Sequence, residues 1–223
     1  MIEINFSYYG IFIFLMVILL QFFIFFIYQV NLKIKYSNFA TPFKINIDEI
    51  RKTLNKKYNL TFDFKLTNEI LFDHISFKNM IIKIPEAYLD ESAYGQINLL
   101  FFHYFYLNNN KFKLKYNKVL FTTFLIFFHI FIILLTMSLY WISIIFLVIS
   151  LIILSLDFVL NHKIFWQSFK DCSTFIEAFQ DGENYLLMKS YLKYKKIAFW
   201  KRYFIFYPLW TKNMVVAFSK WGK

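Results

Sequence analysis

The sequence predicts a helical membrane protein that carries one small α+β domain, and three observations support this fold class. The chain of 223 residues is 59% hydrophobic with a mean hydropathy of +0.47, too apolar for a single soluble domain. Residues 119–160 form an apolar run without Lys, Arg or Glu, and residues 8–30 form a shorter one. Between these two runs, the pattern changes to that of a mixed domain with helices and strands.

The longer apolar run predicts a hairpin of two membrane-spanning helices. One span needs roughly 20 apolar residues, so about 42 residues suffice for two helices and a very short turn. We place the turn at residues 138–141, because Tyr140 and Trp141 favour the interface between lipid and water. Asp157 is the only acidic residue of the run. It lies within about one helical turn of the inner end, and we expect it to reach the lipid headgroups.

Residues 8–30 predict the first span, because Gln21 is the only strongly polar side chain before Gln29 at the inner end. A secretory signal would have a basic start and a small-residue cleavage site, which this segment lacks. We interpret it as a retained anchor in which Gln21 hydrogen-bonds to a neighbouring helix. We therefore expect three spans and four parts: the anchor (1–30), an inner-side α+β domain (31–118), the hairpin (119–160) and inner-side helices with an interfacial segment (161–223).

The positive charges predict the orientation. All 25 Lys and Arg residues lie between the first and second spans or after the third, so three spans place every one on the same side. By the positive-inside rule, the N-terminus and the hairpin tip are outside, and the other parts face the cytoplasm or the mitochondrial matrix. Orientation and attraction to anionic lipid account for the net charge of +11 better than nucleic-acid binding does. We therefore expect no nucleic-acid partner.

The mixed domain contains two predicted helices. Asn46 and Glu49 have the spacing of a capping box, which predicts a helix over residues 47–58. A second helix is expected from residue 90 or 91 to 107, and it leads through a basic stretch into the hairpin.

Three strands are predicted between these helices. Apolar residues alternate over residues 60–66, which is typical of a half-buried strand. Residues 71–76 and 80–84 predict two more strands, joined by a turn at residues 77–79 and stopped by Pro85.

After the hairpin, an apolar stripe at helical spacing predicts a helix that ends near Gly182. Its members are Phe165, Phe169, Cys172, Ile176 and Phe179. Cys172 is the only cysteine, which excludes an internal disulfide, and we expect it to pack as a small apolar residue. A second helix is expected over residues 183–196. Residues 198–221 interleave aromatic and basic side chains and predict an interfacial segment, with packing against a partner subunit as the alternative.

The order of these elements resembles the small membrane-embedded zinc metallopeptidases found widely in bacteria. The likeness covers residues 8–160, and the matching positions follow one another in that family's order: Asp73-His74, Lys78-Asn79, the strand at 80–84, Glu86, Tyr88 and the helix that reaches His103. In that family the helix carries His-Glu-x-x-His, in which two histidines bind zinc and the Glu takes a proton from bound water. Here the helix reads His103-Tyr104-Phe105-Tyr106-Leu107.

The resemblance therefore implies a metallopeptidase-like fold without the zinc motif, that is, a pseudoenzyme. The family's third, acidic ligand follows the hairpin, where this chain has Asp157 and then Asn161-His162. The four histidines, His74, His103, His129 and His162, include no pair at helical ligand spacing. We expect His129 to hydrogen-bond between helices rather than to bind haem. We expect no catalytic residue, metal or cofactor.

These observations favour a non-catalytic membrane subunit that anchors or scaffolds a larger complex. We expect its partners to be the lipid bilayer and the membrane and soluble subunits of an energy-transducing or motor ATPase assembly. With 32 Phe and only 4 Gly, the composition indicates an AT-rich genome, such as that of a wall-less bacterium or an organelle. One alternative is therefore an organelle-encoded subunit of a respiratory complex or ATP synthase. Another is a divergent membrane zinc protease.

Overall fold

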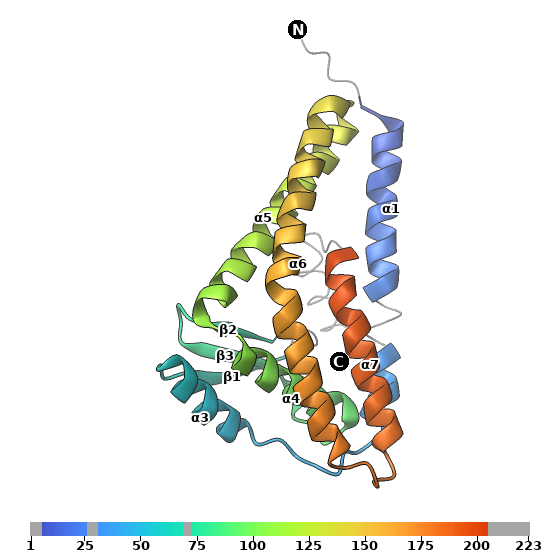
Figure 1. Ribbon diagram of the computed structural model, residues 1–223. Coiled ribbons are helices and arrows are strands. Elements are labelled where there is room, and N and C mark those ends of the chain that lie inside the picture. Colours follow the sequence, from blue (N-terminus) through green and yellow to red (C-terminus); the bar gives the residue numbers. More distant parts are fainter. Residues whose placement is uncertain (1–5, 26–30, 69–72, 205–223) are drawn as a thin grey trace.

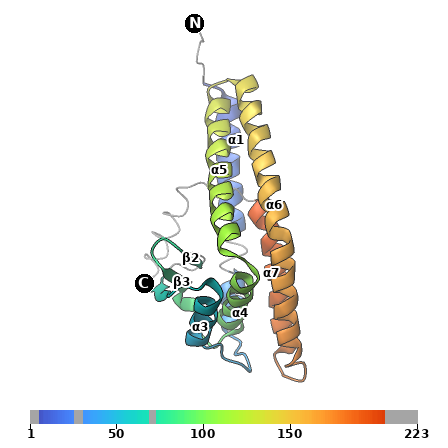
Figure 2. The ribbon, with the colours of Figure 1, turned by 60° about the vertical axis from the view of Figure 1, so that its left-hand side comes forward.

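The computed structural model describes residues 6–25, 31–68 and 73–204, and its shape is elongated (Figure 1). Its upper part contains α1 (Tyr8–Phe25), α5 (Lys111–Thr136) and the first half of α6 (Tyr140–Glu177). We call residues 7–25 and 119–160 the bundle. The described residues of 31–118 and 161–204 form the head, most of which lies at the opposite end (Figures 1 and 2).

Two helices of the bundle, α5 and α6, are long and apolar enough to cross a bilayer. The described apolar stretch of α1 is shorter. Residues 26–30, which complete the predicted first span, lie outside the described residues. The fold is mostly helical with one small sheet, as predicted.

The tip of the hairpin is tighter than expected. Helix α5 ends at Thr136 and α6 begins at Tyr140, so the turn lies slightly before the predicted residues 138–141. Ser138 has a φ of 61°, and the amide of Leu139 donates to the carbonyl oxygen of Leu134 at 3.0 Å. Tyr140 therefore belongs to the first turn of α6, where it is exposed at the tip.

Both hairpin helices extend beyond the apolar run. The basic stretch before residue 119 is the first part of α5, and the helix predicted after residue 160 is the second half of α6. The second hairpin helix and the helix predicted after it are therefore one continuous helix across residue 160. No Gly or Pro stands there, and the buried face of α6 continues in phase from Leu154 through Phe165 to Cys172.

The first helices of the head are α2 (Asn31–Ser37) and α3 (Ile47–Tyr58). The predicted bounds of α3 are confirmed. The side chain of Asn46 accepts the amide of Asp48 at 2.9 Å, and Asn59 ends the helix with a left-handed conformation. Ile50 and Leu54 are buried on one face of α3.

The sheet contains β1 (Asp63–Thr67), β2 (His74–Ser76) and β3 (Ile81–Pro85) in the order β1-β3-β2. The predicted antiparallel pair of β2 and β3 is confirmed, and β3 ends at Pro85. Strand β1 runs parallel to β3, with Phe64 opposite Ile82. As an edge strand it leaves Leu66 exposed, whereas the alternating pattern predicted Leu66 on the buried face of the strand with Phe64.

Helix α4 (Ala93–Asn108) is the central helix of the head and follows the short 3-10 helix η2 (Glu86–Tyr88). Its N-cap is Ser92, whose Oγ accepts the amide of Gly95 at 3.1 Å, so it begins slightly later than predicted. Most of α4 is buried against α2, α3, α6 and α7 (Tyr185–Phe204). Helix α7 continues past the predicted end at residue 196 as far as Phe204, and most of the predicted interfacial segment lies outside the described residues.

Candidate functional site: the junction between the bundle and the head

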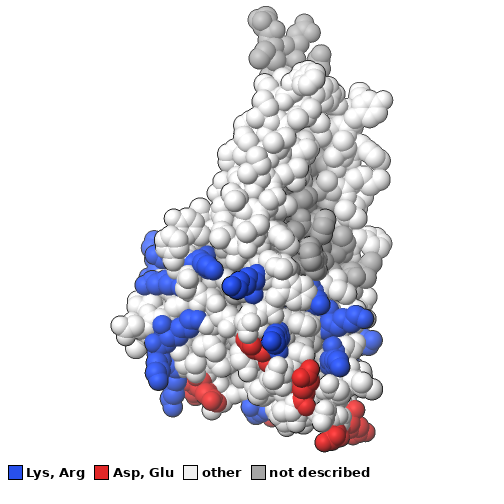
Figure 3. Space-filling model, in the orientation of Figure 1, with Lys and Arg blue, Asp and Glu red and all other residues white. Residues whose placement is uncertain are grey.

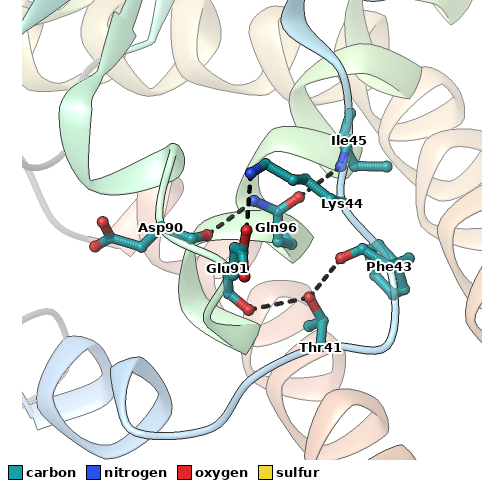
Figure 4. Close-up of polar contacts among 7 residues, drawn as sticks. All are labelled: Thr41, Phe43, Lys44, Ile45, Asp90, Glu91 and Gln96. Carbon is teal, nitrogen blue, oxygen red and sulfur yellow. Dashed lines mark hydrogen bonds and ion pairs between the residues drawn. The ribbon is translucent and has the colours of Figure 1, made fainter.

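Segment 39–45 is tied to the start of α4 (Figure 4). The amide of Thr41 donates to the carbonyl oxygen of Glu91 at 2.9 Å, and the amide of Ala93 donates to that of Phe39 at 2.6 Å. On the other side of this segment, the ring of Phe43 packs against that of Phe175 at the end of α6. The segment therefore connects α4 to α6.

We call segment 39–45 together with the start of α4 the clamp. Gln96 links its two sides through its side-chain amide, which is buried. Its Oε1 accepts the amide of Ile45 at 2.7 Å, and its Nε2 donates to the carbonyl oxygen of Asp90 at 2.8 Å. Lys44 and Glu91 form an exposed ion pair at 2.7 Å beside it (Figure 4). Because exposed ion pairs contribute little, we assign most of the stability of the clamp to Gln96.

Buried tyrosines form the centre of the head. Tyr191 of α7 lies between Tyr36 of α2 and Tyr94 of α4, with ring centroids 4.9 and 5.8 Å away. Asn98 of α4 donates from Nδ2 to the hydroxyl of Tyr191 at 2.8 Å. The hydroxyl of Tyr36 hydrogen-bonds to Ser190 Oγ at 2.9 Å. These contacts fix α7 to α2 and α4.

Asp73 and Lys195 interact electrostatically beside the tyrosines. Burial raises the pKa of Asp73, an effect that the charge of Lys195 opposes. Burial lowers the pKa of Lys195, and the charge of Asp73 opposes this effect in turn. No ion pair within 4.0 Å joins them in the described part of the chain. Such displaced pKa values occur in catalytic sites and in structural networks alike.

Asp157 is buried inside the bundle, so the expectation that it reaches the headgroups is wrong. Asn161 donates from Nδ2 to Asp157 Oδ1 at 2.9 Å and to the Asp157 carbonyl oxygen at 2.8 Å. Asn117 of α5 donates in turn to Asn161 Oδ1. The helical phase explains the burial, because Asp157 shares the inward face of α6 with Leu154 and Asn161.

A second polar contact joins α4 to α6 below this cluster. Asn108 at the end of α4 donates from Nδ2 to Asp171 Oδ2 at 2.6 Å and to Ser168 Oγ at 3.2 Å. Cys172 lies beside them on α6 and is buried, as predicted, and burial raises the pKa of its thiol. The polar side chains of α6 therefore connect it first to α5 and then to α4.

The contacts found for the four histidines do not bring any two of them together. His129 Nδ1 hydrogen-bonds to the carbonyl oxygen of Leu125 at 2.6 Å within α5, rather than to another helix as predicted. His162 accepts a hydrogen bond from Trp166 within α6. His74 lies on β2 opposite Lys83. Among the described residues, no group of three or more His, Cys, Asp or Glu side chains is arranged to hold a metal ion.

His103 is the position that corresponds to the first zinc ligand in the resemblance. Its ring stacks on Tyr104, its Nε2 is buried without a hydrogen-bond partner, and burial lowers its pKa against the opposing charge of Glu49. Asp73, another residue of the resemblance, interacts instead with the charge of Lys195. The two residues therefore have different electrostatic surroundings.

Sequence reasoning did not find the residues that make these connections. Asn161 stands four residues after Asp157, a spacing that places both on one helical face and could have indicated their contact. Gln96, Asn117 and Lys195 gave no local signal, because their partners are distant in sequence.

Comparison with known proteins adds no relative: no family model, no curated protein and no solved structure matches the chain.

Proposed function

We propose that the chain is a three-span membrane protein that acts as a non-catalytic anchoring subunit of a larger complex. The N-terminus and the hairpin tip face outside, and the head faces the inside and holds the partner subunits. The role is positional, because the bundle fixes the head at the membrane surface.

The separation of charge carries this proposal. Lys, Arg, Asp and Glu gather on the head, and the surface of the bundle that faces the viewer in Figure 3 lacks them. Asp157 is the only one of these residues in the described bundle, and it is buried. Exposed apolar side chains cover α1, α5 and α6 instead. A bilayer accommodates such a surface, whereas water disfavours it.

The continuity of α5 and α6 supports the anchoring role. Each helix passes from the bundle into the head without a break. The contact of Asn108 with Asp171 and the packing of Phe43 on Phe175 then hold the head on α6. A load on the head is therefore carried directly into the bundle, as an anchoring subunit requires.

Purification from native membranes in mild detergent tests the proposal. We expect the protein to stay in the membrane after alkaline carbonate washing and to copurify with partner subunits in fixed ratio. Bound metal is measured on the same sample. A chain that washes off without detergent would refute the membrane location. Isolation of the chain without partners would refute the anchoring role. About one zinc per chain, lost in His103→Ala, would instead indicate a hydrolase.

A further inference from the structure

We propose that the junction between the bundle and the head binds the headgroups of anionic phospholipids. The binding residues are lysine and aromatic side chains at the same depth on α5, α6 and α7. This inference rests on the proposed membrane location and adds a lipid preference to it.

The exposed face of α6 changes from apolar to basic side chains between Val159 and Lys163. From Trp141 to Val159, which are 84% and 71% exposed, this face presents large apolar side chains. The same face then presents Lys163, Trp166 and Lys170, which follow at helical spacing. The stretch from Trp141 to Lys163 measures about 33 Å at 1.5 Å per residue. This length matches a hydrocarbon core of about 30 Å and places Lys163 at the inner headgroups.

Helix α5 runs in the opposite direction and shows the same change, with lysines at its start and an apolar exposed face after them. Ile133, Ile126 and Val119 are exposed and lie seven residues apart along one face of the bundle. Seven residues before Val119 stands Phe112, which is 67% exposed and packs on Tyr116 with ring centroids 4.4 Å apart. Lys111 and Lys115, which directly precede Phe112 and Tyr116 in the sequence, are exposed, and Lys111 Nζ lies 5.7 Å from the ring centroid of Phe77. Aromatic rings beside lysines are typical of the interface between lipid and water.

Helix α7 adds a further lysine at the same depth. Lys196 places its Nζ 4.1 Å from the ring centroid of Trp166 and 5.3 Å from that of Phe169. Lys163 stands three residues before Trp166 on the exposed side of α6. Helices α6 and α7 therefore each bring a lysine to the level where the apolar surface ends.

These lysines have no carboxylate partner among the residues that the structure describes. The ion pairs found there are Lys44 with Glu91 and Arg51 with Asp48, and neither includes a lysine of the junction. The ammonium groups of the junction are therefore open to external anions. A lipid phosphate is favoured over a nucleic acid, because these lysines directly continue the faces that contact the hydrocarbon and so lie at the headgroup level.

The experiment measures lipid binding to the full chain after purification in detergent. Equal amounts of phosphatidylglycerol and phosphatidylcholine are added, and the lipids retained per protein are counted by native mass spectrometry. The test variant carries Lys111→Gln, Lys115→Gln, Lys163→Gln and Lys170→Gln. The control variant removes the same charge from exposed head positions, with Lys52→Gln, Lys56→Gln, Lys57→Gln and Lys189→Gln. Circular dichroism and size-exclusion chromatography verify that both variants fold.

We expect the unmodified chain and the control variant to retain phosphatidylglycerol preferentially, and the test variant to lose about tenfold or more of this preference. Equal retention of both lipids by the unmodified chain would overturn the inference, as would an equal loss in the control variant. Inorganic phosphate is added as a competitor. Displacement of the lipid by millimolar phosphate would assign the site to free anions instead. A chain that needs no detergent would refute the membrane location itself.

Discussion

The amide nitrogen of Ser7 donates to the carbonyl oxygen of Thr136 across 2.9 Å, and this bond joins the start of α1 to the end of α5. The hydroxyl of Tyr140 donates to Ser7 Oγ at 3.1 Å, so α6 meets them at the same point. The N-terminus of α1 and the hairpin tip therefore lie at one end of the molecule. The predicted orientation requires both to be on the same side of the membrane, and the labelling experiment below tests it.

Gly10 permits this close approach, and its replacement by Ala is expected to separate α1 from α5. A Cβ atom at Gly10 would lie 2.5 Å from the carbonyl oxygen of Leu135, which is backbone and cannot rotate away. We expect a loss of about 1–3 kcal/mol in the free energy of unfolding. Titration with SDS in mixed micelles measures it. Leu15→Met, at an exposed position of α1, is the control. Equal stability of Gly10→Ala and the control would contradict the observed packing.

Asn161→Leu is expected to destabilise the bundle, because Asp157 loses a donor and Asn117 loses an acceptor. Hydrogen bonds between membrane helices contribute about 0.6–2 kcal/mol, and we expect a loss of about 1–2 kcal/mol in the same titration. Val159→Leu changes an exposed position nearby and should have no effect. An unchanged or more stable Asn161→Leu variant would argue against a structural role for this polar cluster.

Gln96→Leu tests the clamp in the head. It leaves the amide of Ile45 and the carbonyl oxygen of Asp90 without their partners, and both hydrogen bonds are partly buried. A fully buried polar group that loses its partner costs about 1–3 kcal/mol, which is the upper bound for each group here. We expect a clearly lower unfolding temperature by circular dichroism. Lys44→Gln removes only the exposed ion pair beside it and should leave that temperature nearly unchanged. The reverse order of effects would show that the ion pair holds the clamp.

His103 is expected to make the head less stable in acid. Burial lowers its pKa below the usual 6.5, so the unfolded chain binds the proton more readily than the folded one. Stability is therefore complete above pH 6.5 and falls as the pH drops through that value. His103→Phe should flatten the change in unfolding temperature between pH 7 and pH 5, whereas Tyr104→Phe should preserve it. If His103→Phe showed the same fall in unfolding temperature between pH 7 and pH 5, His103 would be excluded as the source of the acid sensitivity.

Much of the fold could be predicted because its signals are local. The capping of α3 by Asn46 and the pairing of β2 with β3 depend on residues close in sequence, and both predictions were correct. The hairpin was predicted from its apolar run alone. The continuation of α6 past residue 160 was not foreseen, because hydrophobicity changes there whereas the helical phase of the buried face does not.

The candidate site could not be predicted in the same way. Asn108 meets Asp171, and Tyr36 meets Tyr191, across many residues of chain, and no spacing rule connects such pairs. Asp157 shows most clearly why depth along a helix is not enough to predict burial. Its depth along the helix predicted contact with headgroups, but its rotation about the helix axis determined that it is buried.

The sidedness of the membrane tests the central claim most directly. Single cysteines are placed at the tip by Trp141→Cys and on the head by Lys52→Cys, in a Cys172→Ala background. Intact cells are treated with a membrane-impermeant maleimide, and the labelling is compared before and after lysis. We predict that position 141 is labelled in intact cells and that position 52 is labelled only after lysis. Labelling of both positions from the same side would contradict a bundle that spans the bilayer between the tip and the head.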